Sequence, residues 1–287
     1  MRKGDENMEE LNVGNIKFYW LKDGVTNLDG GAMFGVVPKK LWSRHYPNDD
    51  ENRIPQRCDP ILVQSGGKNI VIEGGVGNNK FTDKQKKIFG LIEDGDIEDS
   101  LKELGLTFRD IDIVACTHMH YDHFTGISSY SGDELVSTFP NAEIITSRLE
   151  WEEAKNPSDR SKNSYWKKNW QPVEHQVKTF EGDIEITPEI KMTHTGGHCQ
   201  GHSMFTFESG GEQAVHLGDL LPTHAHQNPL WVMAYDDYPM RTIEVKKKWI
   251  SRVKEEDWWV IFYHDALYRA LKLNEEGEIE KKIKVDL

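Results

Sequence analysis

The segment Thr117-His118-Met119-His120-Tyr121-Asp122-His123 places three imidazoles and one carboxylate within six consecutive residues. An apolar run typical of a buried strand, residues 111–116, precedes it, and a turn-like segment, residues 124–126, follows it. Side chains two positions apart in an extended chain point the same way, so His118 and His120 can reach one point in space. Asp122 continues that face if the chain stays extended, whereas a turn must redirect His123. Imidazole and carboxylate are zinc ligands, so the pattern predicts two adjacent metal ions, with a histidine-rich surface turn as the alternative.

The order His-x-His-x-Asp-His after a strand resembles the signature of the metallo-β-lactamase superfamily. The resemblance implies three further ligands, each near the end of a strand: a His in a Gly-His segment, an Asp in a Gly-Asp segment, and a final His. The chain contains all three in this order, as Gly197-His198, Gly218-Asp219 and Tyr263-His264.

By this resemblance the expected ligands form two groups and a bridge. One metal ion corresponds to His118, His120 and His198. The second corresponds to Asp122, His123 and His264. Asp219 matches the carboxylate that bridges the two ions, and a hydroxide bridging the same ions would be the nucleophile. The expected cofactors are two divalent metal ions, Zn²⁺ first, with manganese, iron or cobalt as alternatives on nitrogen and oxygen ligands.

Two side chains are candidates for moving protons during catalysis. Asp122 is the candidate for handling the proton of the attacking water. His224 or His226 is the candidate for protonating the leaving group, with a solvated or core histidine as the alternative for each. His202 is expected to support a ligand rather than to bind metal itself.

Strand-like segments arranged in hairpins, with helices after each group, indicate an α+β fold. The resemblance implies a four-layer αββα sandwich with the metal site at one edge between the sheets. A single domain is expected over residues 11–287, after a mobile N-terminal segment of residues 1–10. Residues 23–60 are expected to form a structured arm beside the active-site mouth or at a homodimer contact, with an ordinary capping loop as the alternative.

Hairpins are expected where two strand-like runs flank a turn, and helices where caps frame an apolar stripe. The expected hairpins pair residues 61–64 with 69–73, 204–207 with 213–217, and 268–273 with 278–283. The expected helices begin at Thr82 with a capping box to Gln85, after Asp96, near Leu149 and near Thr242. Residues 155–176 are expected to form a surface excursion.

The composition limits the partners. Lys and Arg total 35 against 48 for Asp and Glu, which gives a net charge of −13. Because phosphate binding needs clustered positive charge, nucleic acid and anionic membranes are not expected as partners. Three widely spaced cysteines suggest no disulfide framework, which fits a reducing, cytoplasmic location. No signal peptide or membrane span is expected from the sequence.

Two longer segments narrow the resemblance to the YtnP-type branch, regarded as probable quorum-quenching lactonases that open N-acyl homoserine lactones. These segments are residues 29–39 and residues 218–224. The function expected is metal-dependent opening of a lactone ring, that of an N-acyl homoserine lactone, with two alternatives: a phosphotriesterase or arylesterase on the same site, or a metal-bound sensing protein with little turnover. One position departs from the pattern, because lactonases of the superfamily place a tyrosine where Pro222 stands. Tyr235, Tyr238 or His224 are candidates to replace it.

An acyl chain would need an apolar pocket near the metals. The candidates for its lining are Met33, Phe34, Trp231 and Met233. Ordinary core packing is the alternative for all of them.

Overall fold

The computed structural model describes residues 8–285. Most of the segment predicted to be mobile, residues 1–10, therefore lies outside the described residues. At its end the boundary is earlier than predicted, because Glu9 is buried and ion-paired with Arg269 at 3.2 Å, and Glu10 begins the first strand. Arg269 also contacts Asp59 at 2.6 Å, so the start of the described chain is held to the core.

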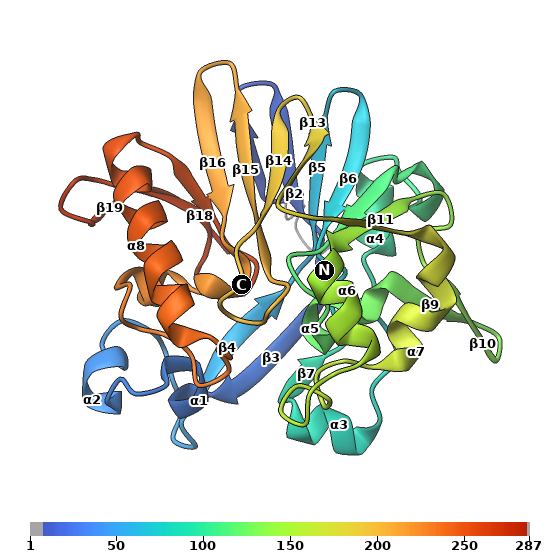
Figure 1. Ribbon diagram of the computed structural model, residues 1–287, viewed down its shortest axis with the longest axis horizontal. Coiled ribbons are helices and arrows are strands. Elements are labelled where there is room, and N and C mark those ends of the chain that lie inside the picture. The colour runs from blue at the N-terminus through green and yellow to red at the C-terminus, as the bar shows by residue number, and fades with distance from the viewer. Residues whose placement is uncertain (1–7, 286–287) are drawn as a thin grey trace, which may run out of the picture.

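Two seven-stranded sheets form the centre of the molecule (Figure 1). The first has the order β1-β2-β5-β6-β8-β11-β12, with bounds Glu10–Val13, Ile16–Trp20, Ile61–Ser65, Lys68–Ile72, Ile113–Ala115, Glu143–Ser147 and Val177–Phe180. The second runs β13-β14-β15-β16-β17-β18-β19, with bounds Asp183–Thr187, Ile190–His194, Ser203–Ser209, Glu212–His216, Trp259–Ile261, Tyr268–Leu273 and Ile279–Lys284. The three predicted hairpins are confirmed as β5–β6, β15–β16 and β18–β19.

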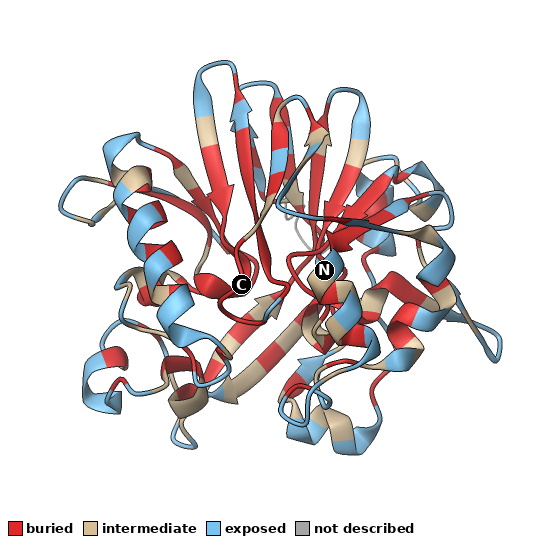
Figure 2. Cartoon of the chain, in the orientation of Figure 1, coloured by how far each residue is buried: buried red, intermediate tan, exposed pale blue. Residues whose placement is uncertain are grey.

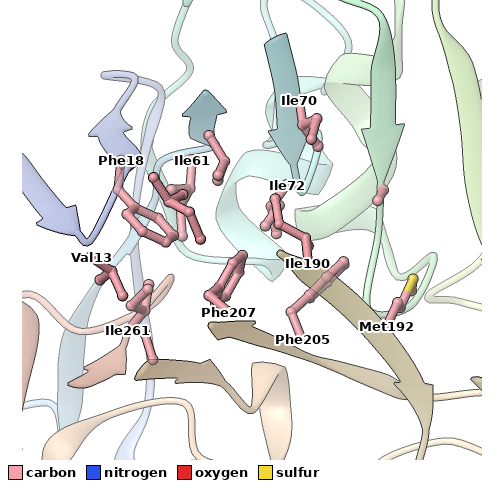
Figure 3. Close-up of a cluster of buried hydrophobic side chains, with 14 of the residues drawn as sticks. Val13, Phe18, Ile61, Ile70, Ile72, Ile190, Met192, Phe205, Phe207 and Ile261 are labelled. Atoms are coloured by element: carbon pink, nitrogen blue, oxygen red, sulfur yellow. The ribbon is translucent and has the colours of Figure 1, made fainter. Parts of the chain in front are cut away.

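The main hydrophobic core lies between the two sheets (Figure 3). Successive side chains of a strand point to opposite faces, so Ile16, Phe18 and Trp20 of β2 enter this core while Tyr19 packs on the outer face. Phe18 meets Phe207 of β15 edge-on, with ring centroids 4.9 Å apart. A one-residue slip would turn these side chains away from the core, so the alternation fixes the register of the strands within each sheet.

Helices cover the outer faces of both sheets, which completes the predicted αββα order (Figure 1). On the first sheet they are α4 (Glu98–Glu103), α5 (Tyr121–Phe124), α6 (Arg148–Lys155) and α7 (Lys167–Trp170). On the second sheet, α8 (Pro239–Glu255) buries Val245, Trp249 and Val253. Figure 2 shows buried and exposed stretches alternating along α8, as expected of a helix with one face against a sheet.

The arm at residues 23–60 is folded, as predicted. It contains β3 (Gly24–Asp29), α1 (Gly30–Phe34), α2 (Lys39–Trp42) and β4 (Arg53–Cys58), and β7 (Leu91–Glu93) joins β3 in a small third sheet. Phe34 stacks between Trp42 and His226, with centroid distances of 4.6 and 4.4 Å. The arm is thereby packed against the segment that follows Asp219.

The local signals for helices also hold in detail. The predicted capping box starts α3 (Asp83–Ile88), where the Thr82 and Gln85 side chains each bond the other's backbone. After Asp96, whose carboxylate accepts from the Glu98 N–H, α4 begins as predicted. Other hairpins were not predicted, among them β9 (Ser128–Ser131) with β10 (Glu134–Ser137), β1 with β2, and β13 with β14. Within residues 8–285 no helix combines the length and apolar character needed to span a bilayer.

Candidate metal centre

The site lies where several strands end at the same edge of the two sheets. In the first sheet β6 and β8 run parallel, so Glu73 after β6 and His118 after β8 emerge side by side. In the second sheet β16 and β17 run parallel, so Asp219 and His264 emerge together. Carboxyl ends of parallel strands are a common place for a site, because the loops that follow them converge.

A short helix, rather than an extended chain, orients Asp122 and His123. The short helix α5 begins at Tyr121, directly after His120, and the His123 N–H donates to the His120 carbonyl at 3.0 Å. Asp122 therefore does not continue the face of His118 and His120, as the extended alternative required. The helical turn instead presents Asp122 and His123 as a separate pair.

Glycines allow the second and third ligand segments to approach the first. Gly197 has φ +107°, and a Cβ there would lie 2.7 Å from Leu220 and 2.9 Å from Thr242. Gly218 has φ +52° and lies against Thr117 and His202 just as closely. His198 and Asp219 can reach the centre only because these two positions carry no side chain.

The structure brings all seven predicted ligands together. Within each of three overlapping groups, the ligand atoms lie within 4.8 Å of one another: His118, His120 and His198; His118, His123 and Asp219; and Asp122, His123 and His264. Nδ1 of His120 is 3.1 Å from Nε2 of His198, and Nε2 of His123 is 3.0 Å from Nε2 of His264. The first and third groups correspond to the two predicted halves of the site, and the second group joins them through Asp219.

The Asp219 carboxylate faces both halves at once. Its Oδ2 lies 3.4 Å from Nε2 of His198 and 3.8 Å from Nε2 of His118. Its Oδ1 lies 3.2 Å from Nε2 of His123 and 3.3 Å from Nε2 of His264. One oxygen directed to each group is the arrangement expected of a carboxylate that bridges two cations.

The electrostatics of the cluster fit bound cations. Burial and the neighbouring imidazoles hold the pKa of His118 and His120 well below its usual value. Burial also disfavours the charged form of His123, but Asp219 and Glu73 raise its pKa to about 10. Within residues 8–285, His118 Nε2 and Asp219 Oδ1 are buried atoms without a hydrogen-bond partner. Packed imidazoles among carboxylates, with unpaired atoms facing one centre, provide the donor set for divalent metal ions.

Most of these imidazoles are oriented through their second ring nitrogen, as is usual for metal-binding histidines. The partners of these nitrogens are Thr117 Oγ1 for His118 at 3.0 Å, Glu73 Oε2 for His123 at 3.2 Å, Asp236 Oδ1 for His198 at 3.0 Å and the Arg57 carbonyl for His264 at 2.8 Å. The sequence did not indicate Glu73, Asp236 or Arg57 for these roles. His202 supports a ligand, as expected, because its Nε2 accepts the backbone N–H of Asp219 at 3.2 Å.

Glu73 has an unusual backbone for its position. Its φ is +62°, a conformation that residues other than glycine rarely adopt. Its side chain is fully buried and accepts from the Thr117 hydroxyl at 2.6 Å, while Oε2 faces His123. Although burial opposes ionisation, His123 and His216 lower the pKa of Glu73 to about 2, so its carboxylate stays charged.

A cavity of about 500 Å³ opens above the ligands. Its base is formed by His120, Asp122, His198, Asp219 and His264. Its apolar lining comes from Leu28, Met33, Ile88, Phe89 and Met233. Two of the four predicted acyl-pocket residues, Met33 and Met233, therefore line the cavity. Phe34 and Trp231 do not, because Phe34 is buried in the stack with Trp42 and Trp231 packs edge-on against Phe34 at 6.0 Å.

The position of His224 corrects one prediction. His224 is not among the residues that line the cavity, and its Nδ1 is bonded to the Asp265 carboxylate at 2.6 Å. Tyr46 and Tyr268 pack on its ring. Its proximity to Asp219 in the sequence did not place it over the metals, because the chain turns away after Asp219 and packs against the arm. His226 is likewise excluded, since it is buried and its Nε2 contacts the Met33 carbonyl at 2.9 Å.

Of the two tyrosines considered as replacements at the Pro222 position, only one reaches the site. Tyr235 lines the cavity together with Asp122 and Asp219, whereas Tyr238 lies at a separate shallow surface depression beside Arg241. Burial, followed by Asp29 and Asp122, raises the pKa of Tyr235 to about 12. Its phenol is therefore protonated at neutral pH.

Comparison with known proteins agrees with this geometry. The family model described as the metallo-β-lactamase superfamily matches residues 53–264. The crystal structure of a probable metal-dependent hydrolase from Staphylococcus aureus is 43% identical, with a TM-score of 0.93, covering 96% of this chain and 99% of that one.

Two curated relatives are N-acyl homoserine lactonases. The protein from Bacillus sp. is 30% identical over 151 residues, which is 52% of this chain and 54% of that relative, so the match spans about half of its length. The protein from Bacillus thuringiensis is 29% identical over 211 residues, covering 70% of this chain and 74% of the relative.

Proposed function

Because the chain belongs to the metallo-β-lactamase superfamily, a group of metal-dependent hydrolases, we propose that it is a lactonase with two metal ions that opens N-acyl homoserine lactones. The reaction adds water across the ring ester: a carbonyl C–O bond forms, the ring C–O bond breaks, and the released alkoxide takes a proton. Quorum quenching would be the biological consequence. The observation that carries the proposal is the Asp219 carboxylate, which directs one oxygen to each ligand group at the base of a cavity with an apolar wall.

Two metal ions in these positions would lower the pKa of a bound water to about 7 and polarise the lactone carbonyl. The first would be held by His118, His120 and His198, the second by Asp122, His123 and His264, and Asp219 would serve both. Zinc suits this donor set, and manganese, iron or cobalt also accept nitrogen and oxygen ligands.

Asp122 and Tyr235 are the side chains that we propose handle protons. Asp122 lines the cavity, and its Oδ2 lies 3.6 Å from Nε2 of His264, so it can accept the proton of the attacking water beside the second metal. Tyr235 faces the same space with a protonated phenol. It can donate to the alkoxide that leaves the ring, the role that the proline at position 222 cannot perform.

The apolar wall supports an acyl substrate rather than a compact polar one. Leu28 and Met33 come from the arm, Ile88 and Phe89 from the end of α3, and Met233 from the loop before α8. A cavity of about 500 Å³ is within the range that holds a small organic ligand. The metals would fix the lactone at the base while these side chains contact the chain.

The test is hydrolysis by the zinc-loaded protein, with a series of N-acyl homoserine lactones compared with an aryl phosphotriester and an aryl ester. We expect lactones to have the highest kcat/KM, and a chelator to abolish the reaction until zinc is restored. The His118→Ala variant should lose the reaction, and His175→Ala should keep it, because His175 is exposed and does not line the cavity. Preference for the phosphotriester or aryl ester would refute the lactone assignment. No hydrolysis by the loaded protein would favour a sensing role.

A further inference from the structure

A buried carboxylate that belongs to neither ligand group lies between two ligand-bearing loops. Glu150, in the first turn of α6, is fully buried. Its Oε1 accepts the backbone N–H of Met119 at 2.7 Å, and its Oε2 accepts the thiol of Cys199 at 3.0 Å. Met119 stands between His118 and His120, and Cys199 directly follows His198. One side chain thus joins two loops that are far apart in the sequence.

A tyrosine adds a third contact from the surface excursion. The Tyr165 hydroxyl donates to Oε1 of Glu150 at 2.8 Å, and its ring packs on His120 with a centroid distance of 4.9 Å. The three groups that contact the carboxylate are a backbone N–H, a phenol and a thiol, all of them neutral. A buried carboxylate is unfavourable unless hydrogen bonds compensate it, and here each bond comes from a group beside a metal-site histidine.

The start of α6 also contacts the His198 loop through Ser147 and through its backbone. Ser147, the N-cap of α6, donates its hydroxyl to the Gly201 carbonyl at 2.6 Å and accepts the Glu150 N–H at 3.1 Å. A Cβ at Gly201 would lie 2.1 Å from the Glu150 nitrogen, so only glycine permits this approach. The helix therefore cannot shift without moving the loop that carries His198.

These contacts act where the spacing of two ligands is most demanding. Nδ1 of His120 and Nε2 of His198 are 3.1 Å apart, close enough for both nitrogens to bind one cation. His198 is oriented by Asp236, whereas Glu150 holds the peptide between His118 and Met119. Removal of Glu150 would free both loops to relax apart.

We propose that Glu150 is a positioning residue that clamps the His118–His120 loop to the His198 loop and so sets the affinity of the first metal position. The inference rests on the proposed function, because it takes these histidines as metal ligands. Loss of the clamp should weaken one metal position and leave the other, formed by Asp122, His123 and His264, close to its original affinity. A general loss of folding stability would instead lower the zinc affinity of both positions.

The experiment is a zinc titration of the full-length protein in competition with a chromophoric chelator, for wild type, Glu150→Ala and Glu150→Gln. The matched control is Glu152→Ala, which removes an exposed carboxylate from the same helix. We expect one of the two zinc affinities to fall by ~10–100-fold in Glu150→Ala, less in Glu150→Gln, and neither to change in Glu152→Ala. Excess zinc should restore much of the lost activity of Glu150→Ala.

If Glu150→Ala does not fold, Cys199→Ala removes the thiol contact alone and should weaken the same zinc position by a smaller factor. If both zinc affinities are unchanged in a folded Glu150→Ala, the proposal that Glu150 clamps the two loops is wrong. The same result in Cys199→Ala would overturn it where that variant is used instead. Absence of zinc binding by the wild type would instead refute the proposed function, so the two failures are distinguishable.

Discussion

Nδ1 of His120 lies 3.1 Å from Nε2 of His198, although 78 positions separate the two residues in the chain. The contact joins a loop of the first sheet to a loop of the second, at the edge where parallel strands of both sheets end. The packing of the two sheets therefore brings short motifs that are far apart in the sequence into one site. Asp236 and Tyr235 lie at the site that this contact forms, because Asp236 orients His198 and Tyr235 lines the cavity above it.

Replacement of Asp236 should weaken the metal site without removing a ligand. Asp236 accepts from Nδ1 of His198 at 3.0 Å, and its other oxygen accepts the Met233 N–H at 3.3 Å. We expect Asp236→Ala to reduce zinc affinity and kcat/KM by ~10–100-fold, and Asp236→Asn to lose less, because an amide oxygen still accepts. Asp133→Ala, in an exposed turn, is the control. Wild-type zinc affinity in Asp236→Ala would show that this bond does not orient His198.

The Tyr235→Phe variant tests the proton donor. It keeps the ring in the cavity and removes only the phenol, so we expect kcat to fall by ~100-fold or more with little change in KM. Tyr238→Phe and His224→Ala should retain nearly full activity, since neither residue lines the cavity. Steady-state kinetics on one acyl homoserine lactone measure all three. Full activity in Tyr235→Phe together with a loss in His224→Ala would reverse the assignment.

Asp23 should make folding stability depend on pH. Its Oδ2 accepts the N–H groups of Val76 at 2.7 Å and Gly77 at 3.2 Å, yet burial raises its pKa from 3.8 to about 7. The folded protein therefore binds this proton more tightly than the unfolded chain does. The stabilisation is complete below about pH 4 and is lost as the pH rises through about 7, a change of roughly 4 kcal/mol at most.

Urea unfolding of wild type and Asp23→Asn in chelator, at several pH values from 4 to 8, measures this effect. The histidine cluster titrates equally in both proteins, so their difference in free energy of unfolding isolates Asp23. We expect the wild type to lose stability relative to Asp23→Asn as the pH rises. Parallel curves for the two proteins would mean that Asp23 keeps an ordinary pKa.

The sequence predicted the parts of this structure that depend on neighbours along the chain. The hairpin β5–β6, the capping box of Thr82 and Gln85, and the candidate ligands all follow from short patterns of turn residues, caps and spacing. The four-layer order came from the family resemblance, because periodicity does not indicate how sheets stack. The hairpin β9–β10 was missed since its serines and exposed residues lack an apolar alternation.

The parts that the sequence did not predict depend on contacts across the fold. Glu73, Asp236 and Glu150 belong to no motif, and only the packed structure places Glu73 and Asp236 against histidines and Glu150 against the Met119 N–H. The Arg57 carbonyl is a backbone group, so no residue type could indicate it. The prediction that His224 protonates the leaving group was wrong for the converse reason. His224 is near Asp219 in sequence, but its bond to Asp265 holds it outside the cavity.

The number of zinc ions bound per folded chain tests the central claim most directly. Elemental analysis after zinc loading and desalting should give two ions per chain for the wild type, because Asp219 presents one oxygen to each ligand group. One ion or none, in protein whose circular dichroism shows the native fold, would contradict a site built for a pair of metals.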